Sequence, residues 1–341
     1  MTESLLSVLS FLWAFAISVF AIPTIINIAH VKKLLDEPNQ RTVHESLTPR
    51  LGGLAIFAGF VSALTIFGDL NYSIQHMLAG CIVIFFIGLK DDIVSVSAFK
   101  KFFVQVLAAG IIMVMGDIRI TSFQGLFGIG ELDPGISYAF TFILVIGITN
   151  AINLIDGLDG LAGTIILIIC FTFGFYFYEV GSPYANVAFC LAGGVIGFLR
   201  YNMTRAIIFM GDAGSLVCGF IISVMAIHFI ELKSVHSSPA IAVGILVIPI
   251  LDTVRVSFLR IINGKSPFSP DKNHLHHKLI SFGLTQLQCV FLLAMVNVAI
   301  ISLVIYFSYI GNLKILGFLL AFALIVSIAF EYKPKVKIQE Q

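Results

Sequence analysis

A pair of adjacent carboxylates, Asp91 and Asp92, ends an apolar run and is the first feature that could carry chemistry. Two neighbouring acids at a membrane boundary repel each other, and both are costly to bury. The pair is either a solvated helix end or a site for a divalent cation bound to a polyphosphate, because hard cations prefer oxygen ligands.

The stretch NAINLIDGLDGL, residues 150–161, lies at the end of another apolar run. Asn153 and Asp156 are three residues apart, so they would lie on one side of a helix end. A glycine follows both Asp156 and Asp159, and glycine allows close approach or a left-handed backbone. The acidic spacing does not match a calcium-binding EF-hand loop, and no Glu closes it. We favour a polar binding site over a purely structural turn.

Asp212 stands between glycines in the segment GDAGS, residues 211–215, at the start of a further apolar run. An acid in this position is either a helix N-cap or a cation ligand beside backbone N–H groups that can meet an anion. Arg50, in the basic segment 38–53, is either part of an ordinary membrane-flanking turn or a contact to an anionic substrate.

Three histidines, His274, His276 and His277, lie within four residues. A zinc site is disfavoured, because no Cys and no i, i+4 histidine pair accompanies them. Lysines flank the cluster, so the histidines could instead grip a diphosphate, together with Arg255 and Arg260. A solvated loop is the alternative.

The composition indicates which elements must position these residues. Of the 341 residues, 58% are hydrophobic and 11% are charged, whereas a soluble domain carries roughly 25% charged residues. Apolar runs of about 20 residues, the length that crosses a bilayer, recur along the whole chain. Because lipid offers the backbone no hydrogen bonds, these runs are expected to be helical. The sequence therefore predicts an all-α, polytopic membrane bundle, and its net charge of +1 argues against nucleic-acid binding.

We expect about eleven transmembrane helices in a single integral membrane domain, residues 1–341. The predicted spans are approximately 5–29, 51–68, 75–90, 102–118, 137–152, 162–179, 184–200, 213–230, 239–258, 287–308 and 313–330. The first is interpreted as an uncleaved span, because no Lys or Arg precedes it and its apolar run is too long for a signal peptide.

The basic residues divide unequally between the two sides that these spans define. Seventeen of the 20 Lys and Arg fall on one side, and only Arg119, Lys233 and Lys314 fall on the other. The positive-inside rule makes the first side cytoplasmic, with the N-terminus periplasmic and the C-terminus cytoplasmic. The segments expected to form an active site then share the cytoplasmic face: about 30–53, 88–101, 150–164, 200–215 and 255–285.

In combination, these motifs resemble the polyprenyl-phosphate N-acetylhexosamine-1-phosphate transferase family over about residues 38–280. The acid pair, the NxxNxxDGxDGL stretch, the GDxGS turn and the histidine cluster occur in the family's order. The resemblance implies ten or eleven helices in the bacterial inner membrane and an active site on the cytoplasmic face. It also implies dependence on Mg²⁺ or Mn²⁺, a UDP-N-acetylhexosamine donor and an undecaprenyl-phosphate acceptor.

Two features look like one branch of that family. Leu275 interrupts the histidine cluster, and the early segment at residues 49–53 is PRLGG. Both are similar to the branch that transfers GlcNAc-1-phosphate and releases UMP, at the start of O-antigen, enterobacterial common antigen or teichoic acid synthesis. The branch that uses UDP-N-acetylmuramoyl-pentapeptide differs in both places. Another UDP-amino-sugar as donor and a homodimer are left open.

The resemblance also implies roles for individual residues. Asp212 would be a Mg²⁺ ligand together with Asp91 and Asp92, and Asp91 is a candidate base for the lipid phosphate. The expected catalytic residues are Asp91, Asp92, Asp156 and Asp159. The expected substrate-binding residues are Asn153, His274, His276, His277, Arg255, Arg260 and Arg50. An ion-coupled transporter is the rival from another class, but the acids lie at one face rather than at mid-membrane.

Overall fold

The computed structural model describes residues 3–35, 47–266 and 273–331. These residues are mostly helical, and the described chain contains no β-strand, although Ser122 and Glu131 form an isolated bridge. The helices are α1 (Glu3–Lys32), α2 (Gly52–Phe67), α3 (Tyr72–Ile93), α4 (Ala98–Gly110), α5 (Pro134–Leu154), α6 (Leu161–Glu179), α7 (Tyr184–Asn202), α8 (Gly211–Ile230), α9 (Ser238–Ile245), α10 (Val247–Ile262), α11 (Leu275–Ser281), α12 (Gln286–Tyr306) and α13 (Asn312–Glu331). Short η segments are η1 (Ile111–Met115), which extends α4, η2 (Leu126–Gly128) and η3 (Ser308–Ile310). The predicted all-α class is confirmed.

Each of the eleven predicted spans overlaps one of these helices or helix pairs. Within the described residues, nine helices are long and apolar enough to cross a membrane, or ten with a bent pair counted as one span. The bent pair is α9 and α10, at the span predicted for 239–258, and the span predicted for 51–68 is the 16-residue helix α2. The chain is a multi-pass membrane protein, while the count of eleven stays a prediction.

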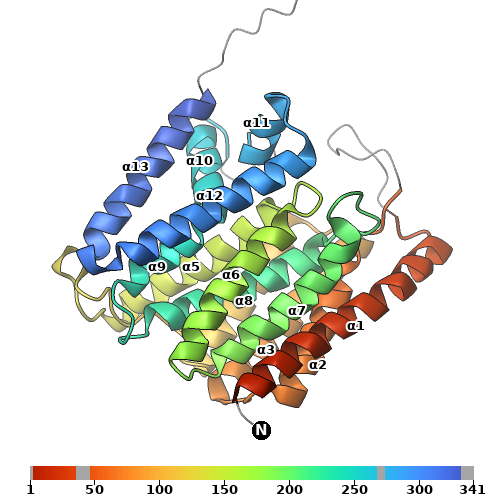
Figure 1. Cartoon of the computed structure of the whole chain (residues 1–341), viewed down its shortest axis with the longest axis horizontal. Helices are drawn as coiled ribbons and strands as arrows, with labels where there is room; N and C mark the ends of the chain where they lie inside the picture. The colour runs from red at the N-terminus through yellow and green to blue at the C-terminus, as the bar shows by residue number, and fades with distance from the viewer. Residues whose placement is uncertain (1–2, 36–46, 267–272, 332–341) are drawn as a thin grey trace, which may run out of the picture.

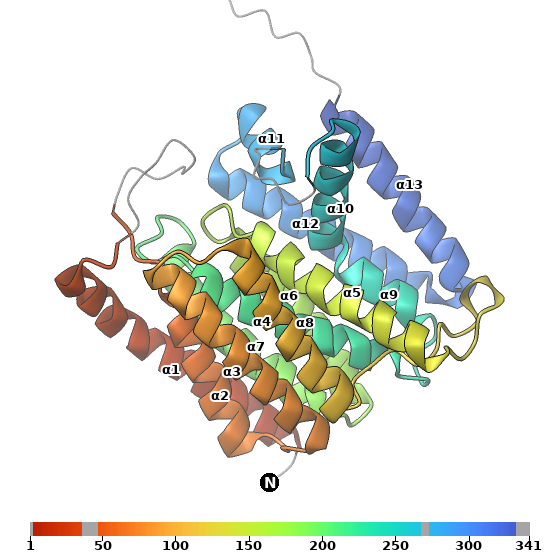
Figure 2. The ribbon, with the colours of Figure 1, turned by 180° about the vertical axis from the view of Figure 1, so that it is seen from behind.

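Helix α8 forms the centre of the bundle. Buried residues make up 94% of its most apolar window, compared with 11% for α13. An all-round apolar helix can face either lipid or other helices, and α8 is covered by protein because it packs against α2, α3, α5, α6 and α9. In Figure 1 and, from behind, in Figure 2, α1 and α2 lie on one side of α8, and α12 and α13 lie on the other.

The one sharp break within a predicted span separates α9 from α10. The two helices are bent by 76° around Leu246, whose backbone is no longer helical. Pro249 lies in the first turn of α10, where a missing backbone N–H is tolerated. In an unbroken helix running on from α9, the same proline would have removed an intrahelical hydrogen bond. The bend directs α10 toward the end of the bundle at which α3 and α5 finish and α8 begins, called the acidic end below (Figure 2).

Candidate active site

The carboxylate of Asp92 joins the end of α3 to the start of α8. Its two oxygens accept hydrogen bonds from the backbone N–H groups of Asp212 and Ala213, at 2.7 and 2.9 Å. The first N–H groups of a helix have no partner within that helix. Asp92 therefore acts as an N-cap supplied by a different helix, and it fixes the position of Asp212 relative to α3.

Glycines allow this close approach. A Cβ at Gly88 of α3 would lie 2.6 Å from the Cα of Ala213, and a Cβ at Gly53 of α2 would collide with the backbone of Gly214. Gly211 has a left-handed backbone, with φ of 71°, and a side chain there would collide with the carbonyl oxygen of Arg50. The glycines of the PRLGG and GDAGS segments are thus required by the packing of α2 and α3 on α8.

An ammonium group lies between two of the predicted acids. Lys101 of α4 donates to Asp212 Oδ2 at 2.8 Å and lies 3.4 Å from Asp91 Oδ2. The other Asp212 oxygen accepts from Asn153 Nδ2 at 3.2 Å, and the same Nδ2 donates to Ser215 Oγ at 2.8 Å. Asp91 and Asp212 therefore face one shared cation position, and about a fifth of each side chain is exposed (19% and 23%).

The loop after α5 brings further acids beside this position. Burial, with the charges of Asp212 and Asp159, raises the pKa of Asp156 to about 7, while the charge of Arg50 opposes the rise. Asp159 Oδ2 accepts from the backbone N–H of Ala206 at 3.2 Å. Asp91, Asp92, Asp156 and Asp212, called the acidic cluster below, therefore lie at the acidic end although they are up to 121 residues apart in sequence.

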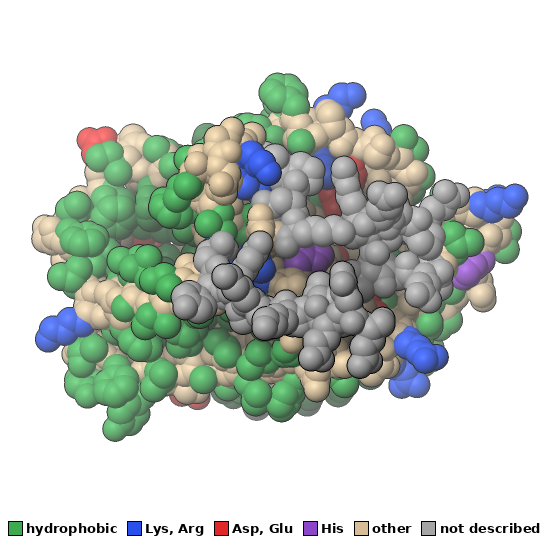
Figure 3. Space-filling model, turned by 90° about the horizontal axis from the view of Figure 1, so that it is seen from above, with side chains coloured by type: hydrophobic (Ala, Val, Ile, Leu, Met, Phe, Trp, Pro, Cys, Tyr) green, Lys and Arg blue, Asp and Glu red, His purple; other side chains and the backbone are tan. Residues whose placement is uncertain are grey.

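The histidine segment reaches the same loop. Gly157 lies so close to His276 that a Cβ there would collide with the imidazole ring. The ring centroids of His276 and His277 are 4.3 Å apart, and those of His276 and His274 are 5.7 Å apart. Burial, followed by the charge of His277, lowers the pKa of His276 to about 3. Red acidic and purple histidine side chains are visible in the middle of this face in Figure 3.

Asp252 of α10 anchors the histidine segment. One of its oxygens lies 2.8 Å from His274 Nδ1, and the other accepts from the backbone N–H of Leu275 at 2.7 Å. Arg255, one turn further along α10, donates to the carbonyl oxygen of Asn273 at 2.7 Å. Arg255 and Arg260 are both only 5% exposed. The contacts of Arg255 and Asp252 indicate that α10 positions the histidines.

Three residues at this end were not predicted as site residues. Lys101 belongs to a basic pair, Lys100 and Lys101, that was counted only among the basic residues of the cytoplasmic side. Ser215 belongs to the GDAGS segment, in which only Asp212 was predicted as a site residue. Asp252 could have been found, since an ionisable residue inside a predicted apolar span is expensive and commonly functional. Residues 267–272, the first part of the predicted anion-binding loop, lie outside the described residues, as does most of the segment before Arg50.

The donor atoms suit a magnesium ion held in part by its substrate. No group of three His, Cys, Asp or Glu in the described part of the chain could hold a metal by itself. Mg²⁺ usually binds through one or two carboxylates plus substrate phosphates and water, rather than in an all-protein cage. Asp91 and Asp212 provide such a pair of carboxylates, whereas both oxygens of Asp92 already accept backbone hydrogen bonds.

Comparison with known proteins agrees with this geometry. Residues 74–230 match the family model described as glycosyl transferase family 4. The chain is 34% identical over 293 residues to the probable undecaprenyl-phosphate N-acetylglucosaminyl 1-phosphate transferase of Bacillus subtilis (strain 168), covering 83% of this chain and 81% of the relative. The chain belongs to glycosyl transferase family 4. The resemblance to the polyprenyl-phosphate N-acetylhexosamine-1-phosphate transferases is thereby confirmed.

Two other relatives extend the comparison. The undecaprenyl-phosphate alpha-N-acetylglucosaminyl 1-phosphate transferase of Escherichia coli (strain K12) is 30% identical over 285 residues, 81% of this chain and 77% of the relative. The decaprenyl-phosphate N-acetylglucosaminephosphotransferase of Mycobacterium tuberculosis (strain ATCC 25618 / H37Rv) is 35% identical over 277 residues, 72% and 69% of the two chains. The family 4 chain is therefore a membrane-embedded transferase, which disfavours the ion-coupled transporter.

Proposed function

We propose that the chain transfers GlcNAc-1-phosphate from UDP-GlcNAc to undecaprenyl phosphate, releasing UMP and forming undecaprenyl-diphosphate-GlcNAc. The reaction takes place at the cytoplasmic face of the bacterial inner membrane and begins a surface polysaccharide pathway. The observation that carries this proposal is the shared cation position between Asp91 and Asp212. The names of the three relatives support the sugar and the polyprenyl acceptor.

The chemical problem is to bring two anions together. One diphosphate bond is exchanged for another, so the site mainly has to cancel charge and hold the reacting groups in line. A Mg²⁺ ion at this position would supply stabilisation of the negative charge that develops on the attacked phosphoryl group. Asp91 and Asp212 would hold that ion, and Asn153 would orient Asp212 through its amide hydrogen bond.

Proton abstraction is a minor part of this proposal. A phosphate monoester has a second pKa of about 6, so the acceptor is mostly dianionic at pH 7. One Asp91 oxygen accepts from the backbone N–H of Val96 at 2.7 Å, and the other faces Lys101. These contacts suit a positioned cation ligand better than a mobile base. Asp92 is then a positioning residue that holds Asp212.

The nucleotide-sugar side is proposed to lie between the loop after α5 and the histidine segment. His276 packs on Gly157, so a donor bound here would meet Asp156 and the imidazoles together. His274, His277, Asp159 and the arginines Arg50, Arg255 and Arg260 complete the proposed substrate-binding set. Of these, Arg50 is exposed and lies close enough to Asp156 to influence its titration.

The test is release of UMP from UDP-GlcNAc by the purified full chain, with undecaprenyl phosphate and Mg²⁺ added. Asp212→Asn should lower turnover by about 100-fold or more, since a ligand contributes at least as much as the groups that orient it. Asp69→Asn is the matched control, because Asp69 is exposed at the opposite end of the bundle. Full activity of Asp212→Asn with an unchanged Mg²⁺ response would refute the ligand role. UDP-GalNAc and UDP-N-acetylmuramoyl-pentapeptide test the donor assignment.

A further inference from the structure

A pocket lined by both polar and apolar residues lies at the end of the bundle opposite the acidic cluster. Helices α5 and α8 each have one end at the acidic cluster and the other end beside this pocket, and a 20-residue helix is about 30 Å long. The pocket has a volume of about 700 Å³ and is lined by the segments 124–128, 233–237 and 310–314. These segments connect α4 to α5, α8 to α9 and α12 to α13. The pocket therefore lies far from the transferase site.

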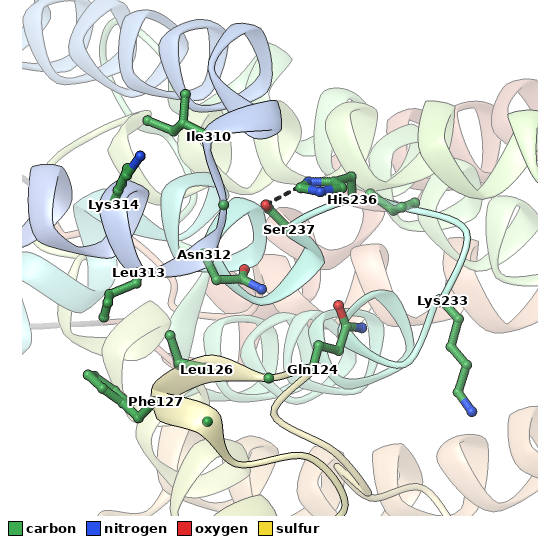
Figure 4. Close-up of a pocket in the computed structure, with 14 residues that line it drawn as sticks. Gln124, Leu126, Phe127, Lys233, His236, Ser237, Ile310, Asn312, Leu313 and Lys314 are labelled. Carbon is green, nitrogen blue, oxygen red and sulfur yellow. Dashed lines mark hydrogen bonds between the residues drawn. The ribbon is translucent and has the colours of Figure 1, made fainter.

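Positive charge is concentrated in this pocket. Only three Lys or Arg residues belong to the predicted outer side, and two of them, Lys233 and Lys314, line the pocket. The third, Arg119, lies elsewhere and pairs with Asp117 at 2.9 Å. In Figure 4, Lys233 and Lys314 lie on opposite sides of the pocket, with Asn312 and Ser237 between them. In this view the ammonium group of Lys233 points away from Asn312 and Ser237, so the two lysines place positive charge at separate edges of the pocket.

No negative charge in the lining offsets the lysines. None of the fourteen lining residues is Asp or Glu. The acid nearest in sequence, Glu231, is not a lining residue, and its two oxygens accept from the backbone N–H and the hydroxyl of Thr121 at 2.7 and 2.6 Å. His236 adds a further polar group, with Nδ1 2.9 Å from the carbonyl oxygen of Ser308. The pocket is consequently suited to an anion.

The backbone around the pocket is strained. Five non-glycine residues in the described chain have positive φ, and three of them, Gln124, Phe127 and Ser237, line this pocket. Such conformations persist only where surrounding contacts hold them, and they cluster at ligand sites. Gln124 is held by bonds from Nε2 to the Ile230 carbonyl oxygen and the Ser238 hydroxyl, at 2.6 and 2.9 Å.

The rim of the pocket is apolar and exposed. Phe127 is 73% exposed and Leu313 is 56% exposed, and both line the pocket. Tyr309, 69% exposed, lies just before the 310–314 segment, and aromatic residues of this kind gather where a membrane meets water. We propose that this pocket binds the phosphate group of an anionic lipid head group, with its acyl chains against Phe127 and Leu313. This site does not depend on the proposed transferase reaction.

Native mass spectrometry of the purified full chain would test this site, with phosphatidylglycerol and phosphatidylcholine of identical acyl chains as probes. The wild type should prefer phosphatidylglycerol by about 30-fold, since each of the two basic residues near a lipid surface contributes about 1 kcal/mol. The double variant Lys233→Gln/Lys314→Gln should lose that preference. Arg119→Gln, which removes a cation of the same predicted face outside the pocket, should keep it.

The outcomes separate the sources of the phosphate group. Lysine-dependent binding of phosphatidylglycerol that inorganic phosphate does not displace supports a lipid ligand. Lysine-dependent binding of inorganic phosphate alone supports the anion site but makes the free ion its ligand. An unchanged lipid preference in the double variant overturns the proposal, provided that its unfolding midpoint in detergent matches the wild type.

Discussion

Asp156, which precedes Gly157 in sequence, and His276, which packs against it, both have pKa values shifted from those of the same groups in water. Burial and the neighbouring His277 lower the pKa of His276 to about 3, so its ring is neutral at pH 7. A neutral imidazole offers one N–H donor and no charge. In the proposed donor site, His276 therefore acts through hydrogen bonding and contact, and positive charge must come from residues such as Arg50.

Asp156 should make stability depend on pH near neutrality. Its pKa rises from 3.8 to about 7, first through burial and then through the charge of Asp212. Between about pH 4 and pH 7 the folded state keeps this proton and the unfolded state releases it, so the free energy of unfolding falls as the pH rises. Asp156 alone should lower the thermal midpoint by roughly a few degrees between pH 5 and pH 8, while the lowered pKa of His276 acts in the opposite direction below about pH 6.5. Asp156→Asn should flatten this slope, and parallel curves for the two proteins would contradict the assignment.

At the scale of elements, the contact between α3 and α8 determines whether the acidic cluster forms. Gly88→Ala would place a methyl group 2.6 Å from the Cα of Ala213 and force α3 away from α8. We expect a loss of about 1–3 kcal/mol in stability, typical of overpacking, and a loss of UMP release, because Asp92 could no longer cap α8.

Gly147→Ala of α5 is the control for this substitution. A Cβ at Gly147 would meet nothing within 4 Å, and alanine is the better helix former. Its thermal midpoint should equal or exceed that of the wild type. Equal midpoints and activities for Gly88→Ala and Gly147→Ala would show that the approach of α3 to α8 does not matter.

Much of the element-level picture could be predicted, because apolar runs and their breaks are local properties of the sequence. The run at 213–230 corresponds to α8, and the acids at 91, 156 and 212 were singled out because they lie at the ends of apolar runs within motifs of the resembled family. Partners distant in sequence could not be predicted. The bond from Asp92 to the start of α8 spans 120 residues, and the pairing of Lys101 with Asp212 spans 111. The bend at Leu246 was also missed, because a proline near a helix start is compatible with either a break or a straight span.

At the scale of the whole molecule, the two ends of the bundle should face different compartments. Ser95 follows α3 at the acidic end, Ser234 follows α8 at the opposite end, and both are exposed. All five native cysteines are buried, so a membrane-impermeant maleimide should label only introduced thiols. Ser234→Cys should react in intact cells, and Ser95→Cys only after permeabilisation. The reverse pattern would invert the predicted orientation.

The ammonium of Lys101, lying between two carboxylates, gives the protein a counter-ion of its own. Repulsion between Asp91 and Asp212 is therefore relieved without an ion from solution, and folding should not require a bound metal. Dialysis against EDTA should leave the unfolding midpoint unchanged, whereas Lys101→Met should lower it and let added Mg²⁺ restore it. Melting of the wild-type bundle in chelator would contradict this. We expect an enzyme built in this way to stay assembled in the bilayer between turnovers, and substrate and ion together to displace its lysine.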